Sequence, residues 1–320
     1  ARLLFAKLGH SETETLTFDK LRPEIVRQKL GEITFTTATS GNHGRGVAWT
    51  AKQLGQKAVI YLPKGTAPRR VAAIEELGSR PVLTDLNYDD AVRVSEAAAE
   101  KNGWYLVQDT AWEGYEEIPR WIMHGYTTIA AEVDAQLAER GWAEPTNLFL
   151  QVGVGSFAAS ILSYFLHRSI DEYPKAAVVE PAAAACMFAS RLAGTKEPQA
   201  AKEGQDSIMS GLACYEANHL AWEILRPFAQ AFLIGPEFAA ARGVRILANP
   251  LGSDPRIVAG ESGAFATGLL SLLLLEEDCA ELKEKLGLDE NSVILLISTE
   301  GDTDPINYRR ILWDGKYPLP

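Results

Sequence analysis

Three segments of the sequence place glycines or hydroxyl side chains directly after an apolar, strand-like run. The first, FTTATSGNHGRG at 35–46, sets Ser40, Asn42 and His43 in a turn between a strand pattern and a helix pattern at 47–54. Open α/β sheets bind their ligands at the carboxyl ends of strands, so this turn is a candidate site. For the motif alone, a simpler interpretation is that Ser40 or Asn42 only caps the following helix.

The second segment is a glycine loop, QVGVGSFAAS at 151–160, which follows a strand pattern and opens a helix. Successive backbone N–H groups at a helix start can cradle a phosphate, and Gly153 and Gly155 let the backbone approach it. The dinucleotide fingerprint is incomplete, because Ala158 replaces its third glycine and the acidic Glu180 ends a strand of a later unit. The loop therefore fits a monophosphate better than a pyrophosphate.

The third segment, STEGDTD at 298–304, follows the apolar run VILLI near the end of the chain. A hydroxyl at the carboxyl end of a strand, such as that of Ser298, can hydrogen-bond a heterocyclic nitrogen. Glu300, Asp302 and Asp304 form either a cation site or a solvated acidic turn, and the turn is the simpler interpretation. The three cysteines are scattered and contain no CxxC pair, so no metal site is predicted.

Short β-branched or aromatic runs alternate with longer helical patterns, which predicts an α/β fold with largely parallel, twisted sheets flanked by helices. One group of strands ends near residue 115 and a second begins near Pro145, joined by a long amphipathic stretch at 118–137. The sequence therefore predicts two sheets. The expected strands lie at 57–62, 81–84 and 104–107, with helices at 67–77 and 88–101, and then at 148–152, 176–179, 231–234 and 293–298.

The composition favours small-molecule chemistry. The 31 basic and 42 acidic residues give a net charge of −11, which repels nucleic acid and anionic membranes. The longest apolar run, at 269–275, is far shorter than the ~20 residues that cross a bilayer. Few and scattered cysteines fit a reducing compartment. We therefore expect a cytoplasmic protein with no nucleic-acid partner and no membrane association.

Taken together, TSGNHG, the glycine loop and a last strand ending in Ser298 resemble fold-type II enzymes that use pyridoxal 5′-phosphate (PLP), the group of tryptophan synthase β and the threonine dehydratases. Three longer segments are similar to the diaminopropionate ammonia-lyase family, and the similarity covers essentially the whole chain. These segments are VQDTAWEGY at 107–115, SGLACYEANHLAWEIL at 210–225 and NPLGSDPRIVAGESGA at 249–264. The resemblance implies PLP as the cofactor and a small amino acid as the substrate.

The resemblance also implies roles for single residues. Asn42 corresponds to the asparagine that holds the 3-hydroxyl of PLP, and Ser298, with Thr299 beside it, corresponds to the hydroxyl that faces the pyridine nitrogen. Asp109 corresponds to an aspartate that contacts the substrate, and His43 is a candidate proton relay. The residues that would cradle the phosphate are Gly153, Val154, Gly155 and Ser156.

The implied reaction is elimination of ammonia from 2,3-diaminopropionate, which yields pyruvate and two molecules of ammonia. The same resemblance implies a homodimer. The expected domains are a small one at 35–115 and a large PLP-binding one formed by 1–34 and 116–320. Trp112 and Tyr115 either line the pocket or pack within the loop that joins the two domains.

The chain departs from the family pattern in three places. The family's Schiff-base lysine precedes a helix that resembles residues 1–8, so we expect this lysine upstream of Ala1, and Lys7 in FAKLG is a poor substitute. Ser40 occupies a catalytic position at which relatives that also process the D-isomer have an aspartate, so we expect weak activity on that isomer. Tyr215 replaces a glycine and is expected to reshape the pocket beside the pyridine ring.

Two other functions stay open on the sequence. A serine, threonine or hydroxyaspartate dehydratase would share the fold and the cofactor. Ser40 favours this dehydratase, whereas Asp109 favours a diamine substrate, because a carboxylate pairs with a β-ammonium group. A catalytically silent homologue that binds an amino acid would lack the lysine upstream of Ala1.

Overall fold

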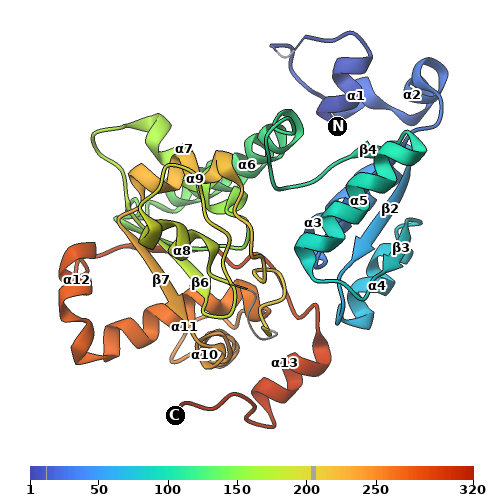
Figure 1. The fold of residues 1–320 in the computed structure, drawn as a ribbon. Helices are drawn as coiled ribbons and strands as arrows, with labels where there is room; N and C mark the ends of the chain where they lie inside the picture. The colour runs from blue at the N-terminus through green and yellow to red at the C-terminus, as the bar shows by residue number, and fades with distance from the viewer. Residues whose placement is uncertain (12, 203–206) are drawn as a thin grey trace. The chain divides into compact units, whose positions relative to one another are not determined.

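The computed structural model describes residues 1–11, 13–202 and 207–320, and these form two compact units, each built on a parallel sheet (Figure 1). The first unit contains Ala1–Asp109 and Glu117–Trp121, and the second contains Thr110–Glu116 and Ile122–Pro320. The expected α/β class with two separate sheets is therefore confirmed.

The first unit has the strand order β3-β2-β1-β4, with every pairing parallel. In Figure 1, helix α5 crosses in front of the sheet; α3 packs against β1 and β2, and α4 packs against β3 and α3. Its elements are α1 (Arg2–Lys7), η1 (Phe18–Leu21), α2 (Pro23–Leu30), β1 (Thr34–Ala38), α3 (Asn42–Gln53), β2 (Lys57–Leu62), α4 (Pro68–Glu75), β3 (Arg80–Leu83), α5 (Tyr88–Asn102) and β4 (Tyr105–Leu106).

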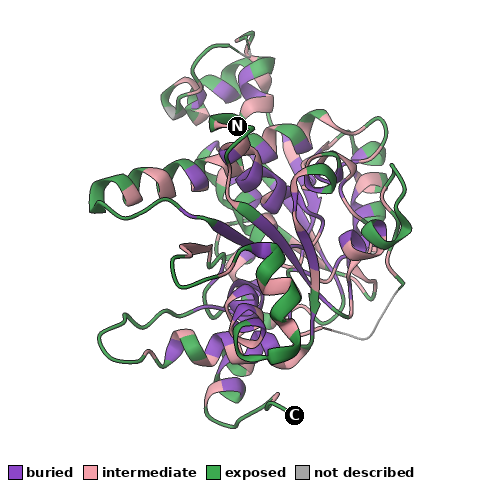
Figure 2. Cartoon of the chain, turned by 90° about the vertical axis from the view of Figure 1, so that its left-hand side faces the viewer, coloured by how far each residue is buried: buried purple, intermediate pink, exposed green. Residues whose placement is uncertain are grey.

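The second unit has the strand order β7-β6-β5-β8, again parallel throughout. All five residues of β5 are buried, as expected for a central strand covered by helices on both faces (Figure 2). Its elements are α6 (Glu117–Arg140, which starts in the first unit), β5 (Asn147–Gln151), α7 (Ser156–Arg168), β6 (Lys175–Pro181), α8 (Cys186–Ala193), α9 (His219–Phe228), β7 (Ala231–Gly235), α10 (Glu237–Ala248), α11 (Glu261–Leu275), η2 (Glu277–Cys279), α12 (Ala280–Leu286), β8 (Ile294–Leu296) and α13 (Pro305–Leu312).

The expected strands are all present, with ends that shift by a few residues, and β2 has the expected bounds Lys57–Leu62. Residues 1–34 differ from the expected grouping, because they belong to the same compact unit as the first sheet. Leu4 and Phe5 of α1 are fully buried in a core that also contains Ile60 of β2. Their assignment to a large cofactor-binding domain stays a prediction.

Helices α10 and α11 cross with their backbones in direct contact. A Cβ on Gly243 of α10 would overlap the carbonyl of Ala264, and one on Gly268 of α11 would overlap the carbonyl of Ala239. Only glycine allows this close approach. None of the helices in the described part of the chain is long and apolar enough to cross a membrane.

Candidate functional site

The first unit brings its candidate residues together at the switch point of its sheet. Strand β1 lies between β2 and β4, so the turn after β1 and the residues after β4 leave the same edge of the sheet. The N–H of Val107 donates to the carbonyl of Thr36 at 2.8 Å and extends the β1–β4 pairing by one step. Asp109 therefore follows β4 at the edge where ligands bind in open α/β sheets.

The SGNHG turn is shaped by Thr39 rather than by Ser40 or Asn42. Thr39 Oγ1 accepts the N–H groups of Gly41 at 3.0 Å and Gly44 at 3.1 Å. The N-cap residue of α3 is Gly41, which has no side chain, so the interpretation of Ser40 or Asn42 as the cap is wrong. The side-chain acceptor for the first turn of α3 is Thr39. Helix α3 begins at Asn42 instead of the expected residue 47.

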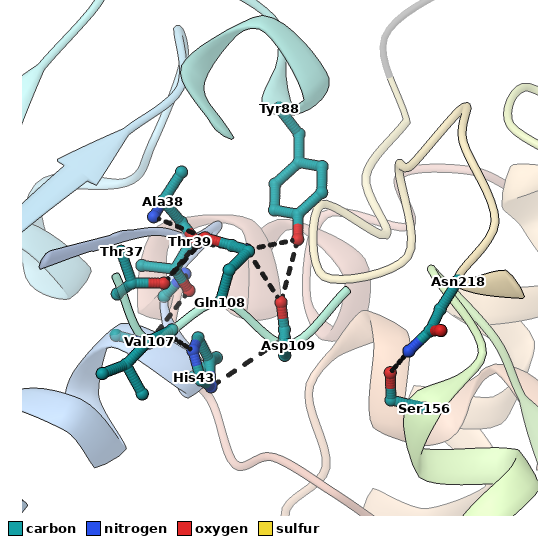
Figure 3. Close-up of polar contacts among 12 residues, drawn as sticks. Thr37, Ala38, Thr39, His43, Tyr88, Val107, Gln108, Asp109, Ser156 and Asn218 are labelled. Atoms are coloured by element: carbon teal, nitrogen blue, oxygen red, sulfur yellow. Dashed lines mark hydrogen bonds and ion pairs between the residues drawn. The ribbon is translucent and has the colours of Figure 1, made fainter. Parts of the chain in front are cut away.

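Asp109 is held in a fixed orientation by two neighbours from the same unit (Figure 3). Its Oδ1 accepts the Tyr88 hydroxyl at 3.0 Å and the Gln108 side-chain amide at 2.9 Å. Gln108 is fully buried, and its Oε1 in turn accepts the Thr37 hydroxyl at 2.8 Å and the Ala38 N–H at 2.9 Å. The end of β1 thus sets the direction of the carboxylate.

His43 lies beside the same carboxylate, with its two ring nitrogens in different surroundings. Its Nε2 is 2.7 Å from the carbonyl of Val107, and its Nδ1 is 3.9 Å from Oδ2 of Asp109. A carbonyl oxygen only accepts, so Nε2 carries a hydrogen. Nδ1 is then the nitrogen that can gain or lose a proton while the ring stays in place.

In the second unit, Gln151 connects the glycine loop with the end of β8. Strand β5 lies between β6 and β8, which is the switch point of this sheet. Gln151 Nε2 donates to the carbonyl of Ile297 at 2.7 Å and to Thr299 Oγ1 at 3.2 Å. Gln151 Oε1 is buried and has no hydrogen-bond partner. The glycine loop and the Ser298–Thr299 segment are therefore neighbours.

The glycine loop is clamped by Asn218, a fully buried residue at the start of α9. The backbone N–H of Asn218 donates to the carbonyl of Val154 at 2.8 Å, and its side-chain amide donates to Ser156 Oγ at 2.8 Å (Figure 3). Its Oδ1 accepts the N–H of Leu220 at 2.9 Å and so caps α9. One side chain thus fixes both the loop and the next helix.

The shape of this loop fits a phosphate group. Gly155 has φ +104 and is the N-cap of α7, and this helix has no side-chain cap. A Cβ on Gly155 would overlap Met187 Cε, and one on Gly153 would lie 3.1 Å from Cys214 Sγ. Backbone N–H groups at an uncapped helix start favour a bound anion. The residues present therefore fit the phosphate of PLP.

Ser298 and Thr299 are exposed after β8, where a ligand could reach their hydroxyls. The acidic residues that follow have structural partners. Buried Glu300 accepts the N–H of Ser262 at the start of α11 at 3.0 Å, and Asp304 accepts the N–H of Asn307 at the start of α13 at 3.1 Å. Among the described residues, no cluster of acidic, histidine or cysteine side chains could hold a metal ion.

The segment after Asp109 is a short hairpin turn attached to α9. Trp112 and Tyr115 exchange backbone hydrogen bonds, and their rings stack at 4.5 Å. His219 fastens this turn, because its Nδ1 is 3.1 Å from the carbonyl of Ala111 and its Nε2 is 3.2 Å from Glu116 Oε1. The stacking supports packing within the loop, and a role of these rings as pocket walls stays a prediction.

The remaining predicted positions are at the surface or partly buried. Ser40 is partly buried, and its carbonyl accepts Arg70 Nη1 at 3.0 Å. Asn42 is exposed at the first position of α3. Lys7 is exposed in α1, with its Nζ 4.6 Å from the centre of the Tyr105 ring. Tyr215 is partly buried, and its carbonyl accepts the N–H of Ala201 at 2.8 Å.

Sequence reasoning missed the residues that hold the site together, namely Tyr88, Gln108, Gln151 and Asn218. Asn218 is the N-cap residue of α9, and an asparagine directly before a helical pattern is the signal that could have identified it. The contacts of Gln108 with Thr37 and Ala38 join residues that are about seventy positions apart, so no local pattern reveals them.

Comparisons with known proteins agree with this geometry. Residues 17–300 match the family model described as pyridoxal-phosphate dependent enzyme. The diaminopropionate ammonia-lyase of Escherichia coli K12 is 47% identical over 321 residues, covering 100% of this chain and 78% of the relative. A crystal structure of the Escherichia coli enzyme with an aminoacrylate-PLP azomethine reaction intermediate has a TM-score of 0.87 at 46% identity, covering 99% of this chain and 77% of the other. A second structure, with D-serine, has a TM-score of 0.89 at 45% identity, covering 100% and 78%.

Proposed function

The chain belongs to the family of pyridoxal-phosphate-dependent enzymes, with the fold-type II architecture, and we propose that it eliminates ammonia from 2,3-diaminopropionate to give pyruvate and two molecules of ammonia. The observation that carries this function is the Asp109 carboxylate, held by Tyr88 and Gln108 with His43 beside it, in a chain 47% identical to a diaminopropionate ammonia-lyase. A carboxylate held in one orientation can form an ion pair with the second ammonium group, which a diamino acid has and serine lacks.

The second unit would hold the cofactor's phosphate and ring. Gly153, Val154, Gly155 and Ser156 would supply the phosphate loop, and Ser298 and Thr299 would supply hydroxyls for the pyridine nitrogen. The family resemblance gives Asn42 the role of holding the 3-hydroxyl. When bound, PLP withdraws electrons from the α-carbon of the substrate and so makes its hydrogen more acidic. A hydroxyl opposite the pyridine nitrogen, unlike a carboxylate, does not keep that nitrogen protonated, which favours prompt elimination.

The residues around Asp109 would bind and orient the substrate. The Asp109 carboxylate attracts a substrate ammonium, and its two hydrogen bonds keep it from turning away. His43 can hold a proton at Nδ1 without moving, since Nε2 stays bonded to Val107. The leaving amine needs a proton, and His43, whose Nδ1 lies 3.9 Å from Asp109 Oδ2, would be the relay that supplies it.

A dehydratase acting on serine or threonine is the second candidate, because Ser40 stands in the SGNHG turn where some relatives have an aspartate. A spectrophotometric assay with the full-length protein loaded with PLP separates the two candidates. We expect L-2,3-diaminopropionate to be at least about tenfold better than L-serine in kcat/KM, with two ammonia molecules released per pyruvate. A preference for L-serine, with one ammonia per pyruvate, would establish the dehydratase instead.

Ser40 is expected to limit the reaction of the D-isomer. A carboxylate at this position would serve as a base on the face opposite the lysine, and a serine hydroxyl is too weak a base to do so. We therefore expect wild-type activity on D-2,3-diaminopropionate well below that on the L-isomer. The Ser40→Asp variant should raise kcat/KM for the D-isomer at least about tenfold, because a positioned base commonly contributes more than that.

The matched control for this substitution is Ser40→Asn, which has nearly the same size as the aspartate variant but no charge. It should leave the D-isomer rate at the wild-type level. A wild-type ratio of D to L rates near unity would contradict the proposed role of Ser40.

We also propose that the protein acts as a homodimer in the cytoplasm. The family resemblance supports the dimer, and the few, scattered cysteines support a reducing compartment. The net charge of −11 supports a small amino acid, rather than nucleic acid or an anionic membrane, as the partner of the site.

A further inference from the structure

Glu180 is a fully buried carboxylate that caps a helix from a distance. It lies on β6, and its Oε1 accepts the N–H of Met187 at 2.8 Å while its Oε2 accepts the N–H of Phe188 at 2.7 Å. These N–H groups belong to the first turn of α8, whose N-cap residue Ala185 provides no side-chain cap. Both oxygens of Glu180 thus satisfy donors that the helix itself leaves unpaired.

The first two side chains of α8 form the back of the phosphate loop. Cys186 Sγ donates to the carbonyl of Gly153 at 3.5 Å. Met187 Cε lies so close to Gly155 that a Cβ there would overlap it. Both side chains are fully buried, so they cannot move away from the loop without disturbing the core. A shift of the α8 start would therefore be transmitted directly to Gly153 and Gly155.

We propose that Glu180 is a positioning residue for the cofactor: through α8 it holds the Gly153–Ser156 loop in the shape that binds the phosphate of PLP. This inference rests on the proposed function only for the identity of the cofactor. Glu180 is not proposed to touch the cofactor or the substrate. It acts through Cys186 and Met187, which lie between the carboxylate and the loop.

The ionisation of Glu180 gives the arrangement a pH dependence. Burial raises the pKa of Glu180 to about 7, against the opposing effect of the hydrogen bonds from the Met187 and Phe188 N–H groups. The ionised carboxylate accepts both N–H groups, whereas a protonated carboxyl directs a hydrogen of its own at one of its neighbours. Below about pH 7 the cap is therefore weakened.

The test measures PLP affinity of the full-length apo protein by absorbance titration at pH 8, which requires no substrate. In Glu180→Gln, one oxygen becomes an NH₂ group that faces a backbone N–H, and we expect PLP to bind about tenfold more weakly or worse. The matched control is Glu172→Gln, an exposed glutamate three residues before β6, which should bind PLP within twofold of wild type. At saturating PLP, kcat of Glu180→Gln should recover to within a few-fold of wild type.

A second variant, Met187→Ala, tests the same contact between α8 and the phosphate loop if the Glu180→Gln protein does not fold. Met187→Ala leaves the two backbone bonds to Glu180 intact and removes the contact with Gly155, and it should also weaken PLP binding several-fold. The ³¹P resonance of bound PLP should shift in both variants. A lowered Tm with unchanged PLP affinity and an unchanged ³¹P resonance would overturn the positioning role.

The pH profile separates this role from a general loss of stability. Between pH 6 and 8, PLP affinity of wild type should rise more steeply than that of Glu180→Gln, in which residue 180 does not titrate. The ionisation of the phosphate itself affects both proteins alike. Parallel profiles would overturn the proposal, and a wild-type protein that does not bind PLP at all would instead contradict the proposed function.

Discussion

Replacing Asp109 by asparagine is expected to lower kcat/KM for L-2,3-diaminopropionate by about a hundredfold or more. Asparagine keeps an oxygen that can accept from Tyr88 and Gln108, so the local structure should persist. The negative charge that attracts the second ammonium group is lost. Steady-state pyruvate formation measures the effect, with circular dichroism as a check of the fold.

Tyr88→Phe is the matched comparison for this prediction. It removes one of the two bonds that orient the carboxylate but keeps the charge, so kcat/KM should fall by about tenfold or less. If the asparagine variant retained half of the wild-type kcat/KM, or lost no more than the phenylalanine variant, Asp109 would have no electrostatic role in substrate binding.

The second large effect is expected at Gly155. Its φ of +104 is a conformation that L side chains rarely adopt, and a Cβ would overlap Met187 Cε and lie 3.0 Å from Ala221 Cβ. Gly155→Ala should therefore lower the free energy of unfolding by about 2–4 kcal/mol. It should also weaken PLP binding by about a hundredfold, because relief of the overlap displaces the phosphate loop.

Chemical denaturation and PLP titration test these two effects separately. Gly125→Ala is the control, since Gly125 lies within α6 and nothing is within 4 Å of the position of its Cβ. This control should leave PLP affinity unchanged and, because alanine is the better helix former, raise stability by up to about 1 kcal/mol. A Gly155→Ala protein that binds PLP within threefold of wild type would show that the loop tolerates a side chain.

The strands of both sheets could be predicted from the sequence because short, fully apolar runs bounded by turn residues are typical of buried parallel strands. The start of α3 could not be predicted in this way. Gly44 and Gly46 lower the helix propensity of its first turns, so the sequence predicts a helix only from residue 47 onward. The tertiary contact that overrides this propensity is the packing of Gly44 against Thr39 and Ile60, where a Cβ would overlap Thr39 Cγ2.

The sequence predicts those site residues that directly follow a strand, because a polar side chain at that position is a local signal. It does not predict side chains that hydrogen-bond the backbone of another element. Asp109 and His43 stand at strand ends in recognisable segments, and the structure places them 3.9 Å apart. From the sequence alone, Glu180 is only an acidic residue that does not fit the dinucleotide-binding pattern. Its contact with the α8 backbone depends on the turn at 182–185, which no periodicity specifies.

The backbone contact between α10 and α11 constrains the edge of the sheet that carries Ser298. The start of α11 is tied to the chain after β8, because Ser262 donates to Glu300 and Gly260 donates to the carbonyl of Glu300. Helices separated by long side chains can slide as those side chains change rotamer. At Gly243 and Gly268 no side chain is present to give way. We therefore expect this edge of the sheet either to keep one register or to lose the packing of both helices, rather than to shift gradually.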